Sequence, residues 1–310
     1  MQKVSIVLPS YNHSHFLKDR LESILNQTYK NWEAIIIDDK STDNSIEIIN
    51  DFLNEHQNFI VKYFVINEEN SGSGYKSWQK GIQLAETEFI WIAETDDYSD
   101  PHFLEEMIKI LENNSQIGLA FCNSNYVDIN KEYLYDSSKR TSFLEVKEEE
   151  YEIFKSSALL DTMPLNPLIT NGSSVVFRKP SSNIPAEIFQ HKQLSDLFLW
   201  SYLVKNKDFS FLNKKLNFFR RHQGSTTTKN QLLNKQGVFD EMIFYSNYFR
   251  LSNEKLKAIL YYFAQNSAFS INTLKKIEDL NHREIMYYYV KSSCKIFIIK
   301  IINSICRLFQ

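Results

Sequence analysis

Short apolar runs alternate with amphipathic stretches through the first hundred residues of the chain. The runs are rich in β-branched and aromatic side chains, as buried strands are, and they occupy residues 4–8, 32–37, 61–66 and 89–93. One amphipathic stretch runs from Ser14 to about Gln27 and another from Tyr75 to about Glu86, each with apolar residues at helical spacing. Strands that alternate with helices in this way predict an α/β fold with a mainly parallel sheet.

Polar clusters follow three of these strands, at residues 9–12, at Asp38 with Asp39, and at Asp96 with Asp97. Ligands of open α/β sheets bind at the carboxyl ends of the strands, where these clusters are expected to lie. Adjacent carboxylates at such a point need partners, and Mg²⁺ or Mn²⁺ together with substrate phosphates can supply them. The pattern therefore predicts a divalent cation and a nucleotide or sugar-phosphate substrate.

A purely structural interpretation of the same acidic residues stays open. Asp100 suits the N-cap of a helix and Pro101 its first position, so the stretch after Asp97 is also good helix-start chemistry. Asp38 and Asp39 would similarly form a solvated turn at a strand end that caps the next helix. Neither arrangement requires a ligand.

The glycine-rich loop at residues 70–74 precedes a helix, but it does not predict a dinucleotide site. That fingerprint places its glycines in the first strand-to-helix turn, which in this chain is the sequence at 9–12. We expect the glycines to allow close approach of the backbone to a nucleotide, with Lys76 or Lys80 near its phosphates. The alternative for both lysines is a solvated helix face.

Four motifs follow one another in the first hundred residues. They are Val-Ser-Ile-Val-Leu-Pro-Ser-Tyr-Asn at 4–12, Ser-Ile-Leu-Asn-Gln-Thr-Tyr at 23–29, Ile-Ile-Ile-Asp-Asp-Lys-Ser-Thr-Asp-Asn-Ser at 35–45 and Glu-Thr-Asp-Asp at 94–97. In order and spacing they resemble the family-2 glycosyltransferases of the GT-A fold, and the resemblance covers roughly the first two-thirds of the chain. It implies an α/β nucleotide-diphospho-sugar transferase fold, with a mostly parallel central sheet flanked by helices and a helical appendage at the carboxyl end.

The resemblance gives a role to each polar cluster. It implies that Pro9 and Tyr11 pack at the nucleotide base, and that Asp39 accepts a hydrogen bond from the N–H of uracil or thymine. It further implies that Asp96 faces the ribose or sugar hydroxyls. Asp97, at the mouth of its strand rather than in the core, would bind the Mn²⁺ or Mg²⁺ ion that bridges the two phosphates.

Glycosyl transfer also needs a general base that takes the proton of the acceptor hydroxyl. We expect Asp196, at the start of an amphipathic helix, to be this base. Family members often carry Gly-Asp-Trp or Glu-Asp here, whereas this chain has Ser195-Asp196-Leu197. The alternative for Asp196 is a first-turn acid favoured by the helix dipole. Glu94 is a second departure, because the family more often has Asp at that position.

Two later segments also resemble the family. The first, residues 168–178, is similar to the strand beneath the acceptor, with Asn171 and Ser173 as polar contacts. The second, residues 218–225, is similar to the motif that ends the catalytic domain, and it implies that Arg221 reaches the diphosphate and that His222 reaches the metal. A surface position without a ligand is the alternative for His222.

Composition narrows the class of protein. The chain has 310 residues, 43% of them hydrophobic, which suffices for one large core and an appendage. A formal net charge of −3 argues against a nucleic-acid binder. Because residues 1–3 lead directly into the first strand, we expect no signal peptide. The cysteines lack metal-ligand spacing, so we expect reduced thiols and a cytoplasmic location; they are Cys122, Cys294 and Cys306.

The last third of the chain departs from the catalytic pattern, so we expect a GT-A catalytic domain at residues 1–225 and a helical region at 226–310. Helices are expected at 238–249, at 254–268 and from about 282 to the end. The last helix is rich in aromatic residues and carries four basic ones: Lys291, Lys295, Lys300 and Arg307. Such a helix suits peripheral contact with the anionic inner face of the cytoplasmic membrane. The alternative is packing on the catalytic domain or on a second subunit of an oligomer.

The sequence therefore predicts an inverting, metal-dependent glycosyltransferase. It would move a sugar from a nucleotide-diphosphate donor, with UDP as the expected carrier, to a hydroxyl of a surface polysaccharide or lipid-linked glycan. Two alternatives remain. A nucleotidyltransferase acting on sugar phosphates would carry a Gly-rich first loop with Arg or Lys, which residues 9–12 lack. A catalytically silent glycan-binding protein would not need Asp97 and Asp196 together.

Overall fold

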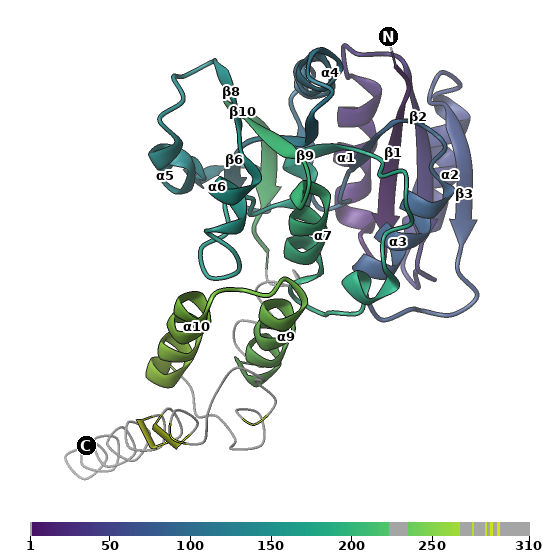
Figure 1. Cartoon of the computed structure of the whole chain (residues 1–310). Coiled ribbons are helices and arrows are strands. Elements are labelled where there is room, and N and C mark those ends of the chain that lie inside the picture. Colours follow the sequence, from purple (N-terminus) through teal and green to yellow (C-terminus); the bar gives the residue numbers. More distant parts are fainter. Residues whose placement is uncertain are drawn as a thin grey trace, which may run out of the picture. The chain divides into compact units, whose positions relative to one another are not determined.

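The computed structural model describes residues 2–222 and 235–266, together with residues 275, 283, 286, 287, 290 and 291. Its contacts divide the chain into two compact units, Met1–His222 and Gln223–Gln310. The first unit contains the sheet and the clusters of polar residues, and it is drawn in purple to green in Figure 1.

The first half of unit 1 alternates strands and helices as the hydrophobic pattern predicts. Its elements are β1 (Val4–Ser10), α1 (Ser14–Leu25), β2 (Trp32–Asp38), α2 (Ser45–Glu55), β3 (Val61–Ile66), α3 (Gly74–Leu84) and β4 (Phe89–Ile92). β1 pairs in parallel with β2 and with β4, and β2 pairs in parallel with β3. The three predicted clusters therefore lie at the same edge of the sheet.

The second half of unit 1 completes the sheet with mixed pairing. Its elements are β5 (Tyr98–Ser99), α4 (Phe103–Asn113), β6 (Ile117–Val127), β7 (Tyr133–Asp136), α5 (Ser138–Thr141), η1 (Ser142–Leu144), β8 (Tyr151–Phe154), α6 (Ser156–Leu160), η2 (Gly172–Ser174), β9 (Val175–Arg178), η3 (Ala186–Phe189), α7 (Ser195–Val204) and β10 (Asp208–Arg220). The strand order is β3-β2-β1-β4-β9-β6-β10-β5. The α/β class is confirmed.

The expectation of a mostly parallel sheet holds only for the first half. β9 lies antiparallel between β4 and β6, while β6 and β10 are parallel to each other. β7 forms an antiparallel hairpin with the end of β6. A short connection suffices for antiparallel neighbours, whereas parallel ones need a crossover of a dozen or more residues. The helical periodicity that marks such crossovers is absent between β6 and β7.

Helices cover both faces of the sheet. Alternate strand residues, such as Ile6 and Ile36, face the core shared with α1, α2 and α4. On the other face α3 lies very close to β1, because a Cβ added at Gly81 would stand 2.2 Å from Cγ1 of Val7. This close approach brings the loop before α3 over the carboxyl ends of β1 and β2 (Figure 1).

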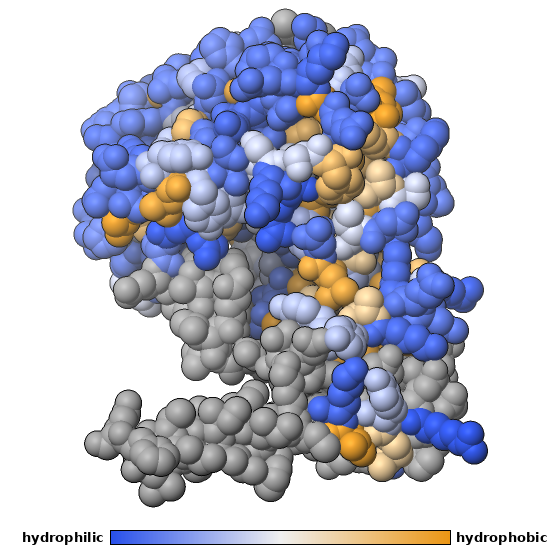
Figure 2. All heavy atoms as spheres, turned by 90° about the vertical axis from the view of Figure 1, so that its left-hand side faces the viewer, coloured by the Kyte–Doolittle hydropathy of each residue, from blue (hydrophilic) through white to orange (hydrophobic). Residues whose placement is uncertain are grey.

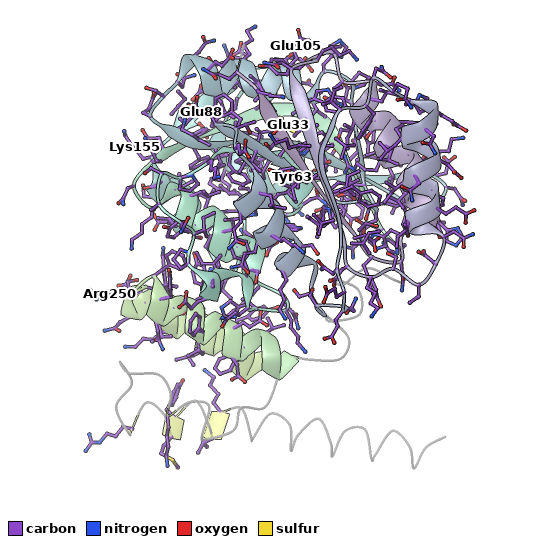
Figure 3. All side chains as sticks on the ribbon, turned by 90° about the vertical axis from the view of Figure 1, so that its right-hand side faces the viewer. Glu33, Tyr63, Glu88, Glu105, Lys155 and Arg250 are labelled. Atoms are coloured by element: carbon purple, nitrogen blue, oxygen red, sulfur yellow. The ribbon has the colours of Figure 1, made fainter. Side chains whose placement is uncertain are left out.

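Ion pairs satisfy charges near the amino-terminal ends of the strands. Lys3 Nζ lies 2.7 Å from Glu33 on β2, and Glu88, directly before β4, pairs with Arg178 at the end of β9. Figure 3 labels Glu33 and Glu88 on this side, with Tyr63 on the edge strand β3. The carboxyl-terminal edge is therefore the one that keeps polar groups for a ligand.

The helix after the acidic pair begins slightly later than the expected start at Pro101. It starts at Phe103 with His102 as its N-cap, so Asp100 is not the N-cap that the sequence suggested. Asp100 instead closes the turn before the helix, where its Oδ1 accepts from the His102 N–H at 2.8 Å. Figure 2 turns to the side that carries α5 and α6, where apolar patches interrupt a mainly hydrophilic surface.

Unit 2 contains α9 (Lys235–Tyr248) and α10 (Asn253–Asn266). Their bounds nearly match those of the helices predicted at 238–249 and 254–268. Lys291 places its ammonium 4.5 Å from the ring centroid of Tyr261 and 5.2 Å from that of Tyr287. Most of the predicted membrane-contacting segment, including Lys295, Lys300 and Arg307, lies outside the described residues, so membrane contact stays a prediction. In the described part of the chain, no helix is both long and apolar enough to span a bilayer.

Of the three cysteines, Cys122 lies within the described part of the chain. It is a free thiol on β6, and burial raises its pKa to about 12. Such a thiol is inert at neutral pH and acts as a small apolar side chain of the core. Cys294 and Cys306 lie outside the described residues.

Candidate functional site

The loops that follow β1, β2 and β4 are tied to one another by hydrogen bonds. The amide N–H of Thr42 donates to Oδ1 of Asn12 at 2.8 Å, and the Thr95 hydroxyl donates to the carbonyl of Pro9 at 3.1 Å. Tyr11 is 43% exposed and stands out from this rim. Pro9 and Tyr11 thus lie at this rim, and their contact with a nucleotide base stays a prediction.

Asp39 fastens the loop before α3 to the end of β2. Its carboxylate accepts from Asn67 Nδ2 at 2.6 Å, from Ser71 N at 2.9 Å and from the Ser71 hydroxyl at 2.8 Å. The residue is only 3% exposed, so any contact with a base must share oxygens already engaged. Asp38 accepts from N–H and Oγ of Ser41, which is the capping turn of the structural interpretation.

Both candidate lysines contact this same loop. Lys76 donates to the carbonyl of Ser71 at 2.9 Å, and Lys80 donates to Oδ1 of Asn67 at 2.7 Å. Gly72 has φ +75°, a conformation that glycine adopts at no steric cost, and it turns the loop between them. Lys76 remains exposed at the rim, where the sequence expects the phosphates.

Asp96 pairs with His222, although they lie 126 positions apart in the chain. His222 Nε2 lies 3.1 Å from Asp96 Oδ2. The His222 ring also packs against Phe16, with centroids 4.8 Å apart. Burial acts to raise the pKa of Asp96, but the hydrogen bond to His222 and the charges of His13 and His222 outweigh it and lower that pKa below 3.8. Asp96 is therefore an anion at neutral pH.

Asp97 lies inside the protein, not at the strand mouth where the sequence placed it. It is 0% exposed, and its carboxylate accepts from Asn171 Nδ2 at 2.8 Å, Ser173 Oγ at 2.8 Å and Arg220 N at 3.0 Å. Burial, helped by the neighbouring charge of Asp96, raises its pKa to about 6. This carboxylate holds the segment that carries Asn171 against the end of β10, and its oxygens are already engaged.

Arg20, on the buried face of α1, hydrogen-bonds these loops, and it was not predicted from the sequence. Its guanidinium donates to the Glu94 carbonyl at 2.8 Å, to Ser99 Oγ at 2.9 Å and to Ser173 Oγ at 3.2 Å. Burial lowers its pKa to about 10, and the charge of Asp97 opposes that fall, so it stays cationic. The sequence did contain a signal for Arg20, because it lies four residues from Phe16 and four from Ile24 and so shares the buried face of α1 with them.

His13 and Arg220 were also missed. His13 hydrogen-bonds the Thr95 hydroxyl, and its ring lies 6.3 Å from that of His222. Arg220 is 1% exposed, donates to Asp19 at 2.7 Å and lies 4.9 Å from the ring of Phe16. His13 directly follows the motif at 4–12, and Arg220 directly precedes Arg221 and His222. Only the fold shows that the two residues converge.

Glu94 and Asp196 lie close to the acidic pair. Burial raises the pKa of Glu94 well above 4.5, and the charges of Asp96, Asp97 and Asp196 add to that rise. This environment favours the protonated form of Glu94, which could donate a hydrogen bond. Asp196 begins the first turn of α7, where its Oδ1 accepts from the N–H of Leu197 at 2.8 Å.

One tryptophan joins the elements that place Asp196. Trp78 of α3 is 2% exposed, and its ring centroid lies 6.0 Å from that of Trp200 on α7. A Cβ on Gly172 would stand 2.6 Å from Cη2 of Trp78 and 3.5 Å from Oε2 of Glu94. The loop with Asn171 and the start of α7 therefore pack around this ring.

We expect Gly172→Ala to destabilise the protein by about 1–3 kcal/mol, because the added methyl group overlaps an immobile ring. Gly74→Ala is the matched control, since a Cβ there meets nothing within 4 Å. Denaturant titration of both variants measures the difference. Equal midpoints for the two variants would show that the loop yields without cost.

The expected acceptor residues support Asp97 and are themselves buried. Asn171 is 4% exposed and Ser173 is 0% exposed, and Asn171 Oδ1 accepts from Asn217 Nδ2 at 3.1 Å. The half-buried Thr170 is the neighbour with an accessible surface. Direct contact of an acceptor with Asn171 or Ser173 would therefore require the loop to move.

Arg221 does not join the cluster around Asp96. Arg220 and His222 both pack on Phe16, whereas the Arg221 guanidinium lies 5.5 Å from the ring of Phe219. Successive residues of an extended chain point to opposite faces, which explains the separation. The diphosphate contact expected of Arg221 does not fit this position.

The pair Asp96 and His222 fits a divalent cation better than Asp97 does. Two neighbouring ligands of an octahedral ion with bonds of about 2.1 Å lie about 3 Å apart. The carboxylate oxygen and imidazole nitrogen are 3.1 Å apart. Within the described residues no group of three or more His, Cys, Asp or Glu side chains could hold a metal. A two-ligand site suits Mg²⁺ or Mn²⁺ when substrate phosphates and water complete the shell.

Comparison with known proteins identifies the fold and the family. The model of the family described as glycosyl transferase family 2 matches residues 5–183. The glycosyltransferase GlyG of Streptococcus pneumoniae is 28% identical over 232 residues, which cover 72% of each chain. A poly(ribitol-phosphate) β-glucosyltransferase of Bacillus spizizenii is 36% identical over 98 residues, 31% of this chain and 15% of that one.

Two solved structures share the fold at low sequence identity. S. aureus TarS 1–349 in complex with UDP superposes with a TM-score of 0.55 and 17% identity, over 94% of this chain and 88% of that chain. The mannosyltransferase PcManGT from Pyrobaculum calidifontis, in complex with GDP-Man and Mn²⁺, gives 0.53 and 14%, over 95% and 86%. The chain belongs to glycosyl transferase family 2 and has the GT-A fold.

Proposed function

We propose that this glycosyltransferase moves a sugar from a UDP-sugar to a hydroxyl of a surface or lipid-linked glycan, with inversion at the anomeric carbon. The observation that carries the proposal is the convergence of the Asp96 carboxylate, which is paired with His222, with Glu94 and Asp196. Such an arrangement offers one position for the diphosphate and a separate position for the general base. The complexes of TarS with UDP and of PcManGT with GDP-Man support a nucleotide-sugar donor.

The donor would lie across the loops after β1 and β2. Tyr11 offers an exposed ring for the base, and Asp39 holds the glycine-rich loop whose Lys76 faces the phosphates. Asp96 and His222 would hold a divalent cation, and PcManGT with Mn²⁺ supports that choice of metal. When bound, such an ion neutralises charge on the departing diphosphate.

Transfer then needs one proton acceptor. The acceptor oxygen attacks the anomeric carbon, its proton passes to the Asp196 carboxylate, and the bond from that carbon to the diphosphate oxygen breaks. A single displacement of this kind inverts the configuration. Glu94, whose protonated form is favoured, would donate to a sugar oxygen of the donor, and the buried Asp97 keeps the η2 loop in place.

Two other classes are less well supported. A sugar-phosphate nucleotidyltransferase would need a basic, glycine-rich first loop, and a silent glycan-binding protein would have no use for an acid cluster of perturbed pKa. UDP release from a panel of UDP-sugars, measured with and without Mn²⁺, tests the proposal. Cation-dependent release supports it, whereas pyrophosphate release with a sugar phosphate and UTP would favour the nucleotidyltransferase.

Replacement of Asp39 tests the nucleotide site. We expect Asp39→Ala to weaken UDP binding by about 1.5–3 kcal/mol, the range for hydrogen bonds to a charged group. The loss combines any contact with the base and the release of the loop held through Ser71. Calorimetric titration with UDP measures it.

Ser71→Ala is the control for the loop, because it removes the hydroxyl contact with Asp39 and leaves the carboxylate with its contacts to Asn67 Nδ2 and Ser71 N. Its loss of UDP affinity measures what that one loop contact contributes. Unchanged UDP affinity in Asp39→Ala would move the nucleotide site away from β2.

A further inference from the structure

An arginine–tyrosine surface, formed by Tyr126, Tyr135, Arg140 and Arg221, lies next to the loop that precedes η2. The Tyr126 hydroxyl donates to Thr170 Oγ1 at 2.8 Å. Its ring stacks on that of Tyr135, with centroids 4.4 Å apart and ring planes at 21°. The hairpin of β6 and β7 holds the two tyrosines opposite each other.

Tyr135 presents an open ring face at this surface. Tyr126 is 6% exposed, whereas Tyr135 is 50% exposed. Since Tyr126 covers one side of the Tyr135 ring, the exposed area belongs mostly to the other side and the edge. A fixed, exposed aromatic plane of this kind suits the apolar face of a sugar ring.

Two guanidinium groups lie near the hydroxyl of Tyr126, on which Tyr135 stacks. Arg140 Nη1 donates to the carbonyl of Pro167 at 3.4 Å, and Arg221 lies over Phe219, whose ring is 5.0 Å from that of Tyr126. Burial raises the pKa of Tyr126, and the charges of Arg140 and Arg221 both oppose that rise, so both lie near one hydroxyl. Across residues 2–222 neither arginine forms an ion pair with a carboxylate.

Two carboxylates of the hairpin have partners other than these arginines. Asp136 pairs with Lys215 at 3.1 Å. Asp128 Oδ1 accepts from the amides of Asn130 and Glu132 at 2.8 and 2.9 Å, which closes the turn between β6 and β7. Arg140 and Arg221 therefore keep their charges available for an anion, although the chain as a whole is slightly acidic.

The surface adjoins the place of transfer. Thr170 precedes Gly172 by two residues, at most roughly 7 Å of extended chain. The Cβ position of Gly172 is 3.5 Å from Glu94, which in turn feels the charge of Asp196. A glycan whose hydroxyl reaches Asp196 can therefore extend along this loop toward Tyr135.

We infer that the arginine–tyrosine surface binds an anionic acceptor glycan, with a sugar ring on Tyr135 and a phosphate or carboxylate group between Arg140 and Arg221. Arginine presents a planar fork that matches both anions, whereas a neutral glycan would leave the two charges unused. The inference rests on the proposed function, because it names the class of acceptor for that same site.

Three matched probes test it: methyl glucoside, methyl glucuronide and methyl glucoside 6-phosphate. Their binding to the full chain with saturating UDP and Mn²⁺ is measured by ligand-observed NMR. We expect the two anionic probes to bind about fivefold or more tightly than the neutral one, and the preference to fall with added salt. The ratio between the anionic probes distinguishes a phosphate from a carboxylate.

Variants show which residues cause the preference for the anionic probes. Arg140→Gln and Arg221→Gln should each reduce it, Tyr135→Ala should weaken all three probes, and Lys139→Gln, the adjacent cation on α5, should change nothing. Equal binding of neutral and anionic probes, absence of binding by all three, or an equal effect of Lys139→Gln would overturn the inference. UDP affinity is measured separately in each variant. Absence of UDP binding would contradict the proposed function itself and not the acceptor inference alone.

Discussion

Asp196→Asn is expected to lower the rate of sugar transfer by roughly 10²-fold or more while UDP affinity stays nearly constant. The amide keeps the shape and the contact with the N–H of Leu197, but it cannot take the acceptor proton. Single-turnover transfer and calorimetric UDP titration, measured on the same preparation, separate the two effects.

Glu94→Gln is the matched control for that experiment. Because its surroundings favour the protonated form of Glu94, a neutral amide there should cost much less activity than Asp196→Asn. If UDP affinity fell in step with rate in Asp196→Asn, that residue would bind the donor and the base would lie elsewhere. A larger loss in Glu94→Gln would exchange the two roles.

The second large effect is expected at the cation. Asp96→Asn and His222→Ala should each remove the part of UDP affinity that depends on Mn²⁺ and lower transfer roughly 10²-fold or more, since charge on the leaving diphosphate is no longer neutralised. UDP titrations in Mn²⁺ and in EDTA measure this dependence. In the variants the two titrations should coincide.

Asp97→Asn separates a metal ligand from a structural carboxylate. The oxygens of Asp97 accept hydrogen bonds from Asn171, Ser173 and Arg220. We expect the variant to lose about 1–3 kcal/mol of stability, because its buried amide N–H would face one of these donors. Loss of Mn²⁺ dependence at unchanged stability in Asp97→Asn would return the metal role to Asp97.

The strands and helices of the first hundred residues were predictable because each buries a face with a clear period. The carboxyl-end position of Asp39 and Asp96 followed from that order alone. What the chain order could not show is that His222 lies beside Asp96, because that contact depends on the antiparallel pairing of the end of β10 with β5, which directly follows Asp97.

The exposure of single carboxylates was harder to predict. Asp96 and Asp97 are neighbours in an extended turn, so their side chains diverge, and only the packing of the η2 loop decides which one is covered. The sequence placed Asp97 outward, but Asn171 and Ser173 enclose it. Arg20 was overlooked for a related reason: a cation on an apolar helix face has meaning only when its partners are known.

Arg20 also has a consequence for how the protein is made. Its three partners belong to segments separated by as many as 153 positions, since Ser173 follows it by that distance while Glu94 and Ser99 lie between. A nascent chain can form β1 to β4 early, yet the guanidinium stays incompletely bonded until residue 173 has been synthesised and docked. Catalytic competence would then arise late in synthesis, and local opening of the η2 segment would abolish it while the first four strands remain folded.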